Sequence, residues 1–347
     1  MNILIRLPNW LGDAVMATYA LEILFKNFEN AHFYLVGSKV SIAIFTHYSN
    51  VTILEDTSKK DGLRILNLYK LAKKIPPCNL ALTFQNNFLS ALFLAFNQAK
   101  FRAGFATELR SFLLNHHPKK PKHTHEAMRF AMLITSTLEH FKDQILTIPK
   151  KLYLKRNLAH IMLPNSFTNS KIAGINAGAA FGSAKRWEEE YFSKCIEYLL
   201  KKNYKILLFG VESENSINAS ILGYLPKKLQ QDHSILNLSG KTNIPSLIAY
   251  FSHLDFLLTN DSGPMHIAAA LGIPTLAIFG PTNTKETAPF CAPKAKIISL
   301  ETLGQKLPCM PCMQRTCPLP KDSSNYHACM RALTPNLVIN TIQSLIS

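Results

Sequence analysis

The feature that most constrains the fold of this chain is a repeated alternation of short apolar runs with longer segments of helical spacing. Asn2 to Leu7 has the pattern of a buried strand, and apolar residues recur at helical spacing from Ala14 to Phe28. The same succession returns later, where Tyr204 to Gly210 precedes a helix that begins at about Glu214. Strands that alternate with helices are typical of parallel sheets with covering helices. The sequence therefore predicts an α/β fold.

Further elements continue this alternation along the chain. The remaining expected strands are His32 to Val36, Val51 to Leu54, Asn79 to Phe84, Ile172 to Asn176, Ile235 to Leu238, Asp255 to Thr259 and Thr275 to Phe279. The remaining expected helices are Phe88 to Phe96, Ser246 to Ser252 and a segment that ends at Ala270. The stretch from His116 to His123 is polar and interrupted by prolines, so we expect a loop there.

The length of the chain argues for two domains. A chain of 347 residues is longer than most single domains, and each half is large enough to bury its own core. We place the boundary at the polar stretch from Pro164 to Ser170, which gives an N-terminal domain of residues 1–165 and a C-terminal domain of residues 166–347. The last helix of the C-terminal domain could pack back on the N-terminal domain. Two such domains facing each other would enclose a cleft, and ligands of open α/β sheets bind at the carboxyl ends of the strands. We therefore expect the functional residues on the loops that follow strands.

Composition excludes several classes of protein. Hydrophobic residues make up 47% and charged residues 17%, which argues against a mainly disordered chain. The longest apolar stretches, such as Ala91 to Phe96, are far shorter than the roughly 20 residues that span a membrane. Met1 to Arg6 does not open a signal peptide, and seven cysteines in this length are not a secreted disulfide framework. We expect a cytoplasmic protein.

The chain is basic, and the positive charge is unevenly placed. Lys and Arg number 38 against 22 Asp and Glu, a formal net charge of +16. Residues 1–165 hold 21 of these basic and 10 of these acidic residues, so the N-terminal half is the more basic. Such an excess favours an anionic partner, whether nucleic acid, a phosphorylated substrate or an acidic membrane surface, although it also serves solubility.

The first loop of interest, Pro8 to Asp13, lies between the first expected strand and the first expected helix. Asp13 has two readings. It could accept backbone N–H bonds at the start of the helix, where a negative charge also suits the helix dipole. Alternatively, a carboxylate at the end of a first strand, beside a glycine that permits close approach, is well placed to act as a general base.

Two loops of the C-terminal half carry charged residues after strands. Gly178 to Trp187 combines small residues, which let a ligand approach the backbone, with Lys185, a mobile cation for a phosphate. Phe209 to Glu214 ends in carboxylates that could bind ribose hydroxyls, as acidic residues do in dinucleotide folds. Each loop could also be ordinary surface structure.

A fourth loop, within Thr259 to Pro274, gives the strongest signal. A strand runs into the turn Asp261-Ser262-Gly263 and then into a helix, and the free N–H groups of a helix N-terminus form an anion site. Pro264 suits the first turn of such a helix. His266 follows in the same turn and faces either the ligand or the packing beneath.

These segments resemble glycosyltransferase family 9, the bacterial lipopolysaccharide heptosyltransferases. The resemblance rests on Pro8 to Asp13, Asn176 to Trp187, Asp261 to Pro274 and Phe279 to Thr282, and it covers nearly the whole chain. The Pro-x-Trp-x-Gly-Asp opening, the Ala-Lys-Arg-Trp loop and a late cysteine-rich segment are similar to the branch that extends the first heptose of the inner core. The resemblance implies a GT-B fold, in which two Rossmann-like domains face a central cleft. The N-terminal domain would hold mainly the acceptor and the C-terminal domain the nucleotide sugar.

The resemblance also implies roles for individual residues. Asp13 corresponds to the catalytic base. The implied ADP-heptose ligands are Lys185 at a phosphate, Glu214 at the ribose, Asp261, Ser262 and Gly263 at the heptose and diphosphate, and His266 in the same site. We prefer Glu214 to Glu212 as the ribose ligand because its distance from Gly210 agrees better with the family pattern.

The implied reaction is transfer of L-glycero-D-manno-heptose from ADP-heptose to the first heptose of the lipopolysaccharide or lipooligosaccharide inner core, with inversion. Asp13 would take the proton of the attacking hydroxyl, a role worth roughly 10²–10⁴-fold in rate. Lys185 and the amides around Ser262 would stabilise the leaving ADP. We expect no catalytic metal and no cofactor, in agreement with the lack of an Asp-x-Asp pair in the sequence.

The implied acceptor, heptosyl-Kdo2-lipid A, is phosphorylated and carried by a membrane, which gives the basic N-terminal half a purpose. Candidate acceptor-binding residues are Lys119, Lys120, Lys122 and Arg129, at core phosphates or at an anionic membrane surface. We expect peripheral contact with the cytoplasmic face of the inner membrane. A nucleic-acid partner is not expected, because the sequence has neither a basic stripe with stacking aromatic residues nor a known binding motif.

Four late cysteines, Cys309, Cys312, Cys317 and Cys329, are separated by two, four and eleven residues. A C-x-x-C start is compatible with a tetrahedral zinc site. The later gaps do not match a standard finger or ribbon, and the resemblance implies no metal, so we favour free, partly buried thiols. The distance of these cysteines from the four loops along the sequence favours a structural role.

Two enzymatic alternatives and two others remain. The chain could be another member of the same family with a different core acceptor, or a GT-B epimerase of a nucleotide sugar, which would need further acid and base groups in the cleft. From other classes, the chain could be a nucleic-acid binder or a nucleotide-binding module without activity. In neither of these would Asp13 act as a catalytic base.

Overall fold

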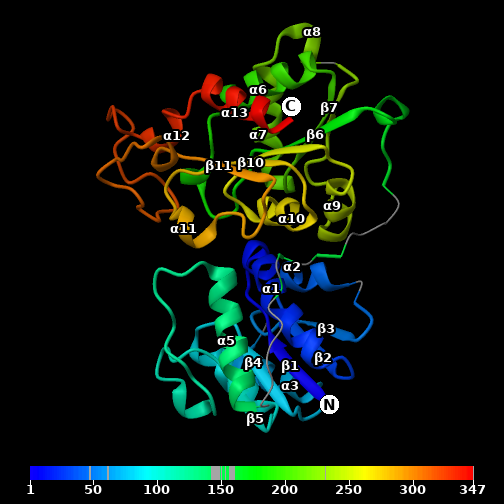
Figure 1. Ribbon diagram of the computed structural model, residues 1–347, viewed down its shortest axis with the longest axis vertical. Helices are drawn as coiled ribbons and strands as arrows, with labels where there is room; N and C mark the ends of the chain where they lie inside the picture. The colour runs from blue at the N-terminus through cyan, green and yellow to red at the C-terminus, as the bar shows by residue number, and fades with distance from the viewer. Residues whose placement is uncertain are drawn as a thin grey trace. The chain divides into compact units, whose positions relative to one another are not determined.

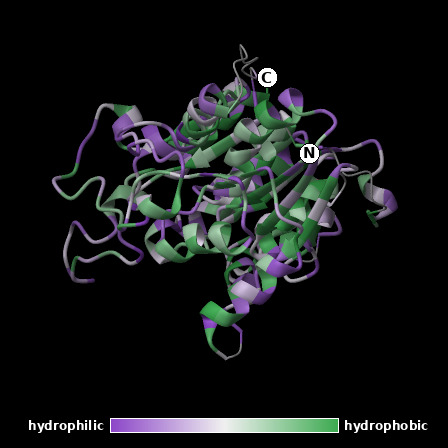
Figure 2. Cartoon of the chain, turned by 90° about the horizontal axis from the view of Figure 1, so that it is seen from below, coloured by the Kyte–Doolittle hydropathy of each residue, from purple (hydrophilic) through white to green (hydrophobic). Residues whose placement is uncertain are grey.

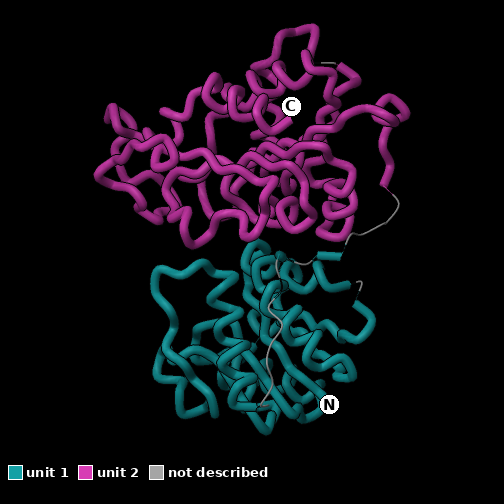
Figure 3. Tube along the Cα trace, viewed as in Figure 1, with its two compact units in different colours: residues 1–155 teal, residues 156–347 magenta. Residues whose placement is uncertain are grey.

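The computed structural model describes residues 1–347 except 47, 61, 142–148, 150, 153, 156–160, 231 and 347. The chain forms two compact units, Met1–Lys155 (unit 1) and Arg156–Ser347 (unit 2), as Figure 3 shows. The boundary expected between residues 165 and 166 falls within unit 2, before its first strand. Both units are α/β, so the predicted class is confirmed (Figure 1).

Unit 1 contains a five-stranded sheet in the order β3-β2-β1-β4-β5, and every strand pair in it is parallel. Its strands are β1 (Asn2–Arg6), β2 (His32–Gly37), β3 (Val51–Glu55), β4 (Leu80–Thr83) and β5 (Phe101–Ala103). Its helices are α1 (Leu11–Asn27), α2 (Lys39–Ile42), α3 (Arg64–Lys73), α4 (Phe88–Phe96) and α5 (Glu126–Phe141), with short 3-10 turns at Ala43–Phe45 and Ser111–Leu113.

The central strand β1 shows why unit 1 folds this way. Ile3, Leu4 and Ile5 are all completely buried, as expected for a parallel strand that is covered on both faces. Helix α1 packs against α5, and α3 packs against α4. The right-handed connections of parallel strands place these two helix pairs on opposite faces of the sheet.

Unit 2 contains a six-stranded parallel sheet in the order β11-β10-β9-β6-β7-β8. Its strands are β6 (Lys171–Asn176), β7 (Tyr204–Phe209), β8 (Ile235–Asn237), β9 (Phe256–Asn260), β10 (Thr275–Ile278) and β11 (Ala295–Ile298). Its helices are α6 (Glu189–Lys201), α7 (Asn215–Gly223), α8 (Lys227–Gln230), α9 (Ile244–Phe251), α10 (Gly263–Leu271), α11 (Thr284–Thr287), α12 (Ala328–Arg331) and α13 (Pro335–Ile346). Four 3-10 turns lie at Asn165–Phe167, Ser183–Lys185, Glu212–Glu214 and Glu301–Leu303.

The core of unit 2 joins segments that are far apart in the sequence. Trp187 and Phe192 pack with strand residues such as Ile206, and hydrophobic residues are concentrated in the strands and helices (Figure 2). The last helix, α13, contributes Val338 and Ile342 to this same core. The expected packing of this helix on the N-terminal domain stays a prediction.

The strand order of each sheet locates its ligand-binding edge. In unit 1 the chain runs outward from β1 to β3 and then returns to β4, so the order reverses between β1 and β4. In unit 2 the same reversal lies between β6 and β9. Open α/β sheets bind ligands outside the carboxyl ends of the strands at such a reversal. The loops after β1, β4, β6 and β9 are therefore the places to look for a site.

Every expected strand and helix is present, with differences of a few residues at the ends. For example, α1 begins at Leu11, three residues before the first residue of the expected helix. Several further elements were not expected from the sequence, among them α3, α5, α6, β5 and β11. Within the described ranges, no helix is both long enough and apolar enough to cross a lipid bilayer.

Candidate functional site

A buried ion pair lies at the reversal point of unit 2. Asp261 directly follows β9, and Lys185 ends the 3-10 turn in the loop after β6. The Lys185 Nζ atom is 2.6 Å from Oδ2 of Asp261, with the two side chains only 12% and 4% exposed. Thr282 donates a hydrogen bond of 2.6 Å to the same carboxylate oxygen. The predicted phosphate ligand and the predicted heptose ligand are therefore in direct contact.

The Lys185 ammonium also lies over an aromatic ring. Its Nζ is 4.8 Å from the centroid of the Phe181 ring, and the guanidinium carbon of Arg315 is 5.5 Å from the same centroid. Two cations therefore share one ring at this point of unit 2. Such contacts are favourable where the cation is partly removed from water, as Lys185 is here.

Buried amides hold the strand ends beneath this ion pair. The Asn176 side chain, at the end of β6, donates to Oγ1 of Thr259 at 3.2 Å and to Oγ of Ser262 at 3.1 Å. The Asn260 side chain donates to the carbonyl of Ala177 at 2.7 Å. These bonds join the loop after β6 to the turn after β9, so the two halves of the site are fixed relative to each other. Buried polar groups that are satisfied in this way give a rigid arrangement.

Glu214 and Glu212 differ in where their carboxylates lie. The Glu214 side chain is buried, and its Oε2 accepts the N–H of Val211 at 3.0 Å. A Cβ placed on Gly178 would come within 2.2 Å of the Glu214 carboxylate, so this carboxylate packs directly on the loop after β6. A Cβ on Gly240 would instead meet the Glu212 carboxylate. The geometry therefore favours Glu214 over Glu212 as a ligand beside the Lys185 loop.

Helix α10 begins directly after the ion pair. Ser262 is its N-cap residue, and its side chain is bonded within the amide network instead of capping the helix. Gly263 and Pro264 open the first turn, whose backbone amides point out of the helix end and favour an anion. His266 follows in this turn and is buried, and its expected part in the donor site stays a prediction.

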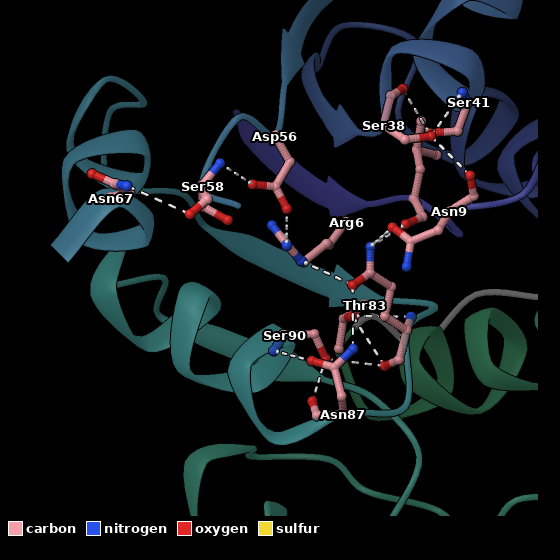
Figure 4. A network of polar contacts seen from close by, with 12 residues as sticks. Arg6, Asn9, Ser38, Ser41, Asp56, Ser58, Asn67, Thr83, Asn87 and Ser90 are labelled. Carbon is pink, nitrogen blue, oxygen red and sulfur yellow. Dashed lines mark hydrogen bonds and ion pairs between the residues drawn. The ribbon is translucent and has the colours of Figure 1, made fainter. Parts of the chain in front are cut away.

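In unit 1, Asp13 lies in the first turn of α1 and is partly buried. The loop before it is held by residues from neighbouring strand ends, as Figure 4 shows. The Gln85 side chain donates to the Leu7 carbonyl at 2.8 Å and to Oδ1 of Asn9 at 3.1 Å. Ser38 donates to the Asn9 carbonyl at 2.8 Å. The end of β1, and with it the start of α1, is thus fixed by the loops after β4 and β2.

Below this loop, Arg6 and Asp56 form a buried ion pair (Figure 4). The Arg6 guanidinium also bonds the Gln85 side chain and lies 4.7 Å from the centroid of the Phe93 ring. Burial of Asp56 opposes its ionisation, but Arg6 together with hydrogen bonds from Ser58 holds the pKa of Asp56 below its ordinary value of 3.8. The pair is therefore ionised at neutral pH and stabilises the ends of β1 and β3.

The four residues proposed for the acceptor are placed differently. Lys119 and Lys122 are exposed and Lys120 is half-buried in the loop before α5. Arg129 is buried within α5, where its guanidinium contacts Glu126 and donates to the carbonyls of Pro121 and Thr124. Arg129 therefore anchors the lysine loop, and the three lysines are the residues that reach solvent.

The four late cysteines belong to a segment, residues 309–329, that packs against the Lys185 loop; we call it the cysteine segment. The Ala184 N–H donates to the Arg315 carbonyl at 3.0 Å, and the Ala184 carbonyl lies 3.0 Å from Nε2 of His327. A Cβ on Gly182 would clash with the Arg315 backbone. The Met313 N–H donates to the Pro281 carbonyl at 2.9 Å, next to Thr282. The segment is thus far from the site in sequence but in contact with two of its loops.

Most of the predicted residues of unit 2 are brought together, and several others were not predicted. Lys185, Asp261 and Ser262 share one set of contacts. Thr282 belongs to the motif from Phe279 to Thr282, and its position in the loop after β10 is a sequence signal that could have identified it as a site residue. No sequence pattern identified Arg315 or His327, because their contacts with Ala184 join positions more than a hundred residues apart.

Comparison with known proteins places the chain among glycosyltransferases. Residues 68–322 match the family model described as glycosyltransferase family 9 (heptosyltransferase). The curated lipooligosaccharide heptosyltransferase 2 of Campylobacter jejuni subsp. jejuni serotype O:6 is 37% identical over 99% of this chain and 99% of its own length.

Two solved structures of Escherichia coli proteins share the fold. The structure of ADP-heptose lps heptosyltransferase II matches with a TM-score of 0.77 at 24% identity, over 100% of this chain and 98% of that one. Heptosyltransferase WaaC with ADP matches with a TM-score of 0.74 at 16% identity, over 99% of this chain and 100% of that one. The expected fold of two Rossmann-like units is therefore confirmed.

Proposed function

Because this chain belongs to glycosyltransferase family 9, the heptosyltransferases, we propose that it transfers L-glycero-D-manno-heptose from ADP-heptose to the first heptose of the lipopolysaccharide or lipooligosaccharide inner core. The observation that carries this proposal is the buried Lys185–Asp261 pair at the start of α10. It combines a cation, a carboxylate and outward-pointing backbone amides in one place, which suits a sugar joined to a diphosphate.

The donor is bound by unit 2 in this proposal. Lys185 and the first amides of α10 bind the diphosphate, and Asp261 accepts hydrogen bonds from heptose hydroxyls. Without donor, Asp261 neutralises Lys185, so the diphosphate replaces one anionic partner of the ammonium with another. Glu214 receives the ribose hydroxyls, because its carboxylate lies on the loop that leads to Lys185.

The acceptor hydroxyl attacks the anomeric carbon from the face opposite ADP, and the configuration inverts. The bond from that carbon to the acceptor oxygen forms as the bond to the diphosphate oxygen breaks, and the diphosphate leaves with the electron pair. Asp13 takes the proton of the acceptor hydroxyl. Lys185 and the α10 amides stabilise the negative charge that develops on the departing ADP, without needing to protonate it.

The acceptor is heptosyl-Kdo2-lipid A, and the exposed lysines of the loop before α5 bind its phosphates. Charge supports this assignment, because residues 1–165 hold most of the positive excess of the chain. We place the enzyme at the cytoplasmic face of the inner membrane through peripheral contact, since the acceptor carries its own lipid anchor. Anionic membrane surfaces attract such lysines by roughly 1 kcal/mol each.

The decisive experiment supplies ADP-heptose with a series of truncated core acceptors and measures product mass and anomeric configuration. We expect one added heptose only when the acceptor already carries its first heptose, with inverted configuration. Transfer to an acceptor without that heptose, or retention of configuration, would contradict the proposal. Isomerisation of ADP-heptose without any acceptor would indicate an epimerase instead.

A further inference from the structure

The four cysteines of the cysteine segment line one small cavity. Cys309, Cys312, Cys317 and Cys329 all line it, together with His327, and its volume is about 20 Å³. A cavity of roughly 10–15 Å³ already admits one water molecule, so this one has room for a single ion. Three of the four thiols are partly buried and Cys309 is exposed, which leaves an entry route from solvent.

The donor set fits a tetrahedral metal site. Four cysteines that begin with a C-x-x-C pair are typical ligands of structural zinc, and four-sulfur tetrahedral sites also suit iron. Within the described ranges, no three or more His, Cys, Asp or Glu side chains are already arranged to hold a metal ion, so the thiols would turn inward as the ion binds. Each thiol loses its proton on coordination, so four protons are released for one divalent ion.

The backbone around the cavity already supports a sulfur ligand. The N–H of His327 donates to Sγ of Cys317 at 3.4 Å. Hydrogen bonds from N–H groups to ligand sulfurs are a common outer-shell feature of metal–thiolate sites. His327 itself is directed elsewhere, because its Nε2 lies 3.0 Å from the Ala184 carbonyl. The ring therefore links the cavity to the Lys185 loop instead of adding a fifth ligand.

We propose that the four cysteines bind one structural metal ion, of the zinc class, and that this ion positions the phosphate-binding loop of unit 2. Ala184 precedes Lys185, and both of its backbone polar groups are bonded to the cysteine segment. The ion fixes the fold of the segment, the segment fixes Ala184, and Ala184 directs Lys185 toward Asp261. The four cysteines are positioning residues, since they touch neither donor nor acceptor. The claim about Lys185 rests on the proposed function, whereas the metal site does not.

The first test is metal content. We expect protein purified without chelator to contain one zinc or iron ion per chain. Inductively coupled plasma mass spectrometry measures this content. Cys312→Ser and Cys329→Ser should lose this ion, whereas Cys291→Ser should keep it, because Cys291 is exposed and lies outside the cavity. Co²⁺ added to reduced, metal-free protein should give intense thiolate-to-cobalt charge-transfer absorption. Wild-type protein without metal and without this absorption would overturn the proposal, even if the serine variants fail to fold.

The second test measures positioning without relying on activity. Removal of the ion should increase the hydrogen exchange of the backbone amides of residues 182–187, because the Ala184 N–H then loses its fixed acceptor. Unchanged exchange in a protein that does bind the ion would overturn the positioning claim. Hydrogen exchange reports on the loop even if the protein binds no ADP-heptose. A lack of ADP-heptose binding would contradict the proposed function but not the metal site.

The link to the donor can be tested at His327. His327→Ala should keep the metal and weaken ADP-heptose binding by about tenfold or more in calorimetry, comparable to losing one charge-assisted hydrogen bond. His327→Gln, whose amide can donate to the Ala184 carbonyl, should restore most of the affinity. An ADP-heptose affinity of Cys329→Ser equal to that of the wild type, in protein shown to lack the ion, would remove the link between the metal and Lys185.

Discussion

At the scale of single residues, the site depends on charges held in fixed positions. Lys185 and Asp261 lie in contact and are mostly buried, so neither side chain can move into solvent without breaking the ion pair. Asp13 belongs to the other unit, where it lies in the first turn of α1. Donor binding and proton removal are therefore assigned to different residues of different units, and they are separable by mutation.

Replacing Asp13 by Asn tests the role of the base. We expect kcat to fall by roughly 10²–10⁴-fold, because the amide cannot accept the acceptor proton. The affinity for ADP-heptose should not change, since the proposed donor ligands all lie in unit 2. Glu29→Gln is the matched control, because Glu29 is an exposed acid just beyond the end of the same helix. A kcat for Asp13→Asn within a few-fold of the wild type would exclude Asp13 as the base.

Adding one methyl group at Gly178 tests Glu214. In Gly178→Ala the new Cβ would lie 2.2 Å from the Glu214 carboxylate, so this carboxylate must move. We expect a higher KM for ADP-heptose and an unchanged KM for the acceptor in steady-state kinetics. Gly223→Ala is the control, because a Cβ there meets nothing within 4 Å. Equal donor KM values in the two variants would argue against Glu214 as a donor ligand.

At the scale of elements, strand ends are fixed by polar contacts between neighbouring loops. In unit 1 the Arg6–Asp56 pair joins the end of β1 to the residue after β3. A buried pair of this kind is costly to break, because the remaining charge stays buried without its partner. The exposed pair of Glu55 and Lys60, close by in the sequence, is solvated and contributes little.

Asp56→Asn should lower the free energy of unfolding by about 3 kcal/mol in urea denaturation at pH 7. Glu55→Gln should change it by less than about 1 kcal/mol. Because the folded state lowers the pKa of Asp56 below 3.8, its contribution is present above that pH and is lost as the pH falls further through the folded pKa. The difference between wild type and Asp56→Asn should therefore shrink in acid, and a difference that stays constant down to pH 2 would contradict this account.

At the scale of the whole molecule, the two units differ in charge and in the tasks that we propose for them. Unit 1 contains the basic loop before α5 and the proposed base, while unit 2 contains the site proposed for the nucleotide sugar. The uneven charge therefore has a direct consequence for kinetics. Long-range attraction of a phosphorylated acceptor should depend on ionic strength, whereas donor binding at a buried pair should depend on it less.

Replacing Lys119, Lys120 and Lys122 together by Gln should raise the acceptor KM several-fold and weaken its dependence on salt. The KM for ADP-heptose should stay the same. Replacement of Lys201, Lys227 and Lys228, three exposed lysines of unit 2, removes the same charge and is the control. An equal rise of the acceptor KM in both variants would show that only the net charge of the protein matters. An acceptor KM that rises in neither variant would exclude the loop before α5 as an acceptor-binding site.

The sequence predicted local features of this molecule better than distant contacts. Strands β1 to β4 and β6 to β10 were predicted because buried parallel strands are continuous apolar runs. The last helix, α13, was expected, but its contribution to the core of unit 2 was not, because that core joins segments far apart in the sequence. Lys185 and Asp261 were predicted as site residues, but their direct contact was not, because it joins two loops that are separated along the chain by three strands, β7, β8 and β9.

The contacts of Ala184 and Trp187 with the end of the chain have a consequence for biosynthesis. The Ala184 carbonyl contacts His327, which lies 143 positions later in the chain. The Trp187 indole donates to the carbonyl of Leu333, which lies 146 positions later. At roughly 5–20 residues per second, a ribosome needs about 7 to 30 s to cover that distance. A nascent polypeptide thus exists for some seconds with the central strands of unit 2 already made and the Lys185 loop still without these contacts. A product that ends before residue 327 lacks the Ala184–His327 contact altogether.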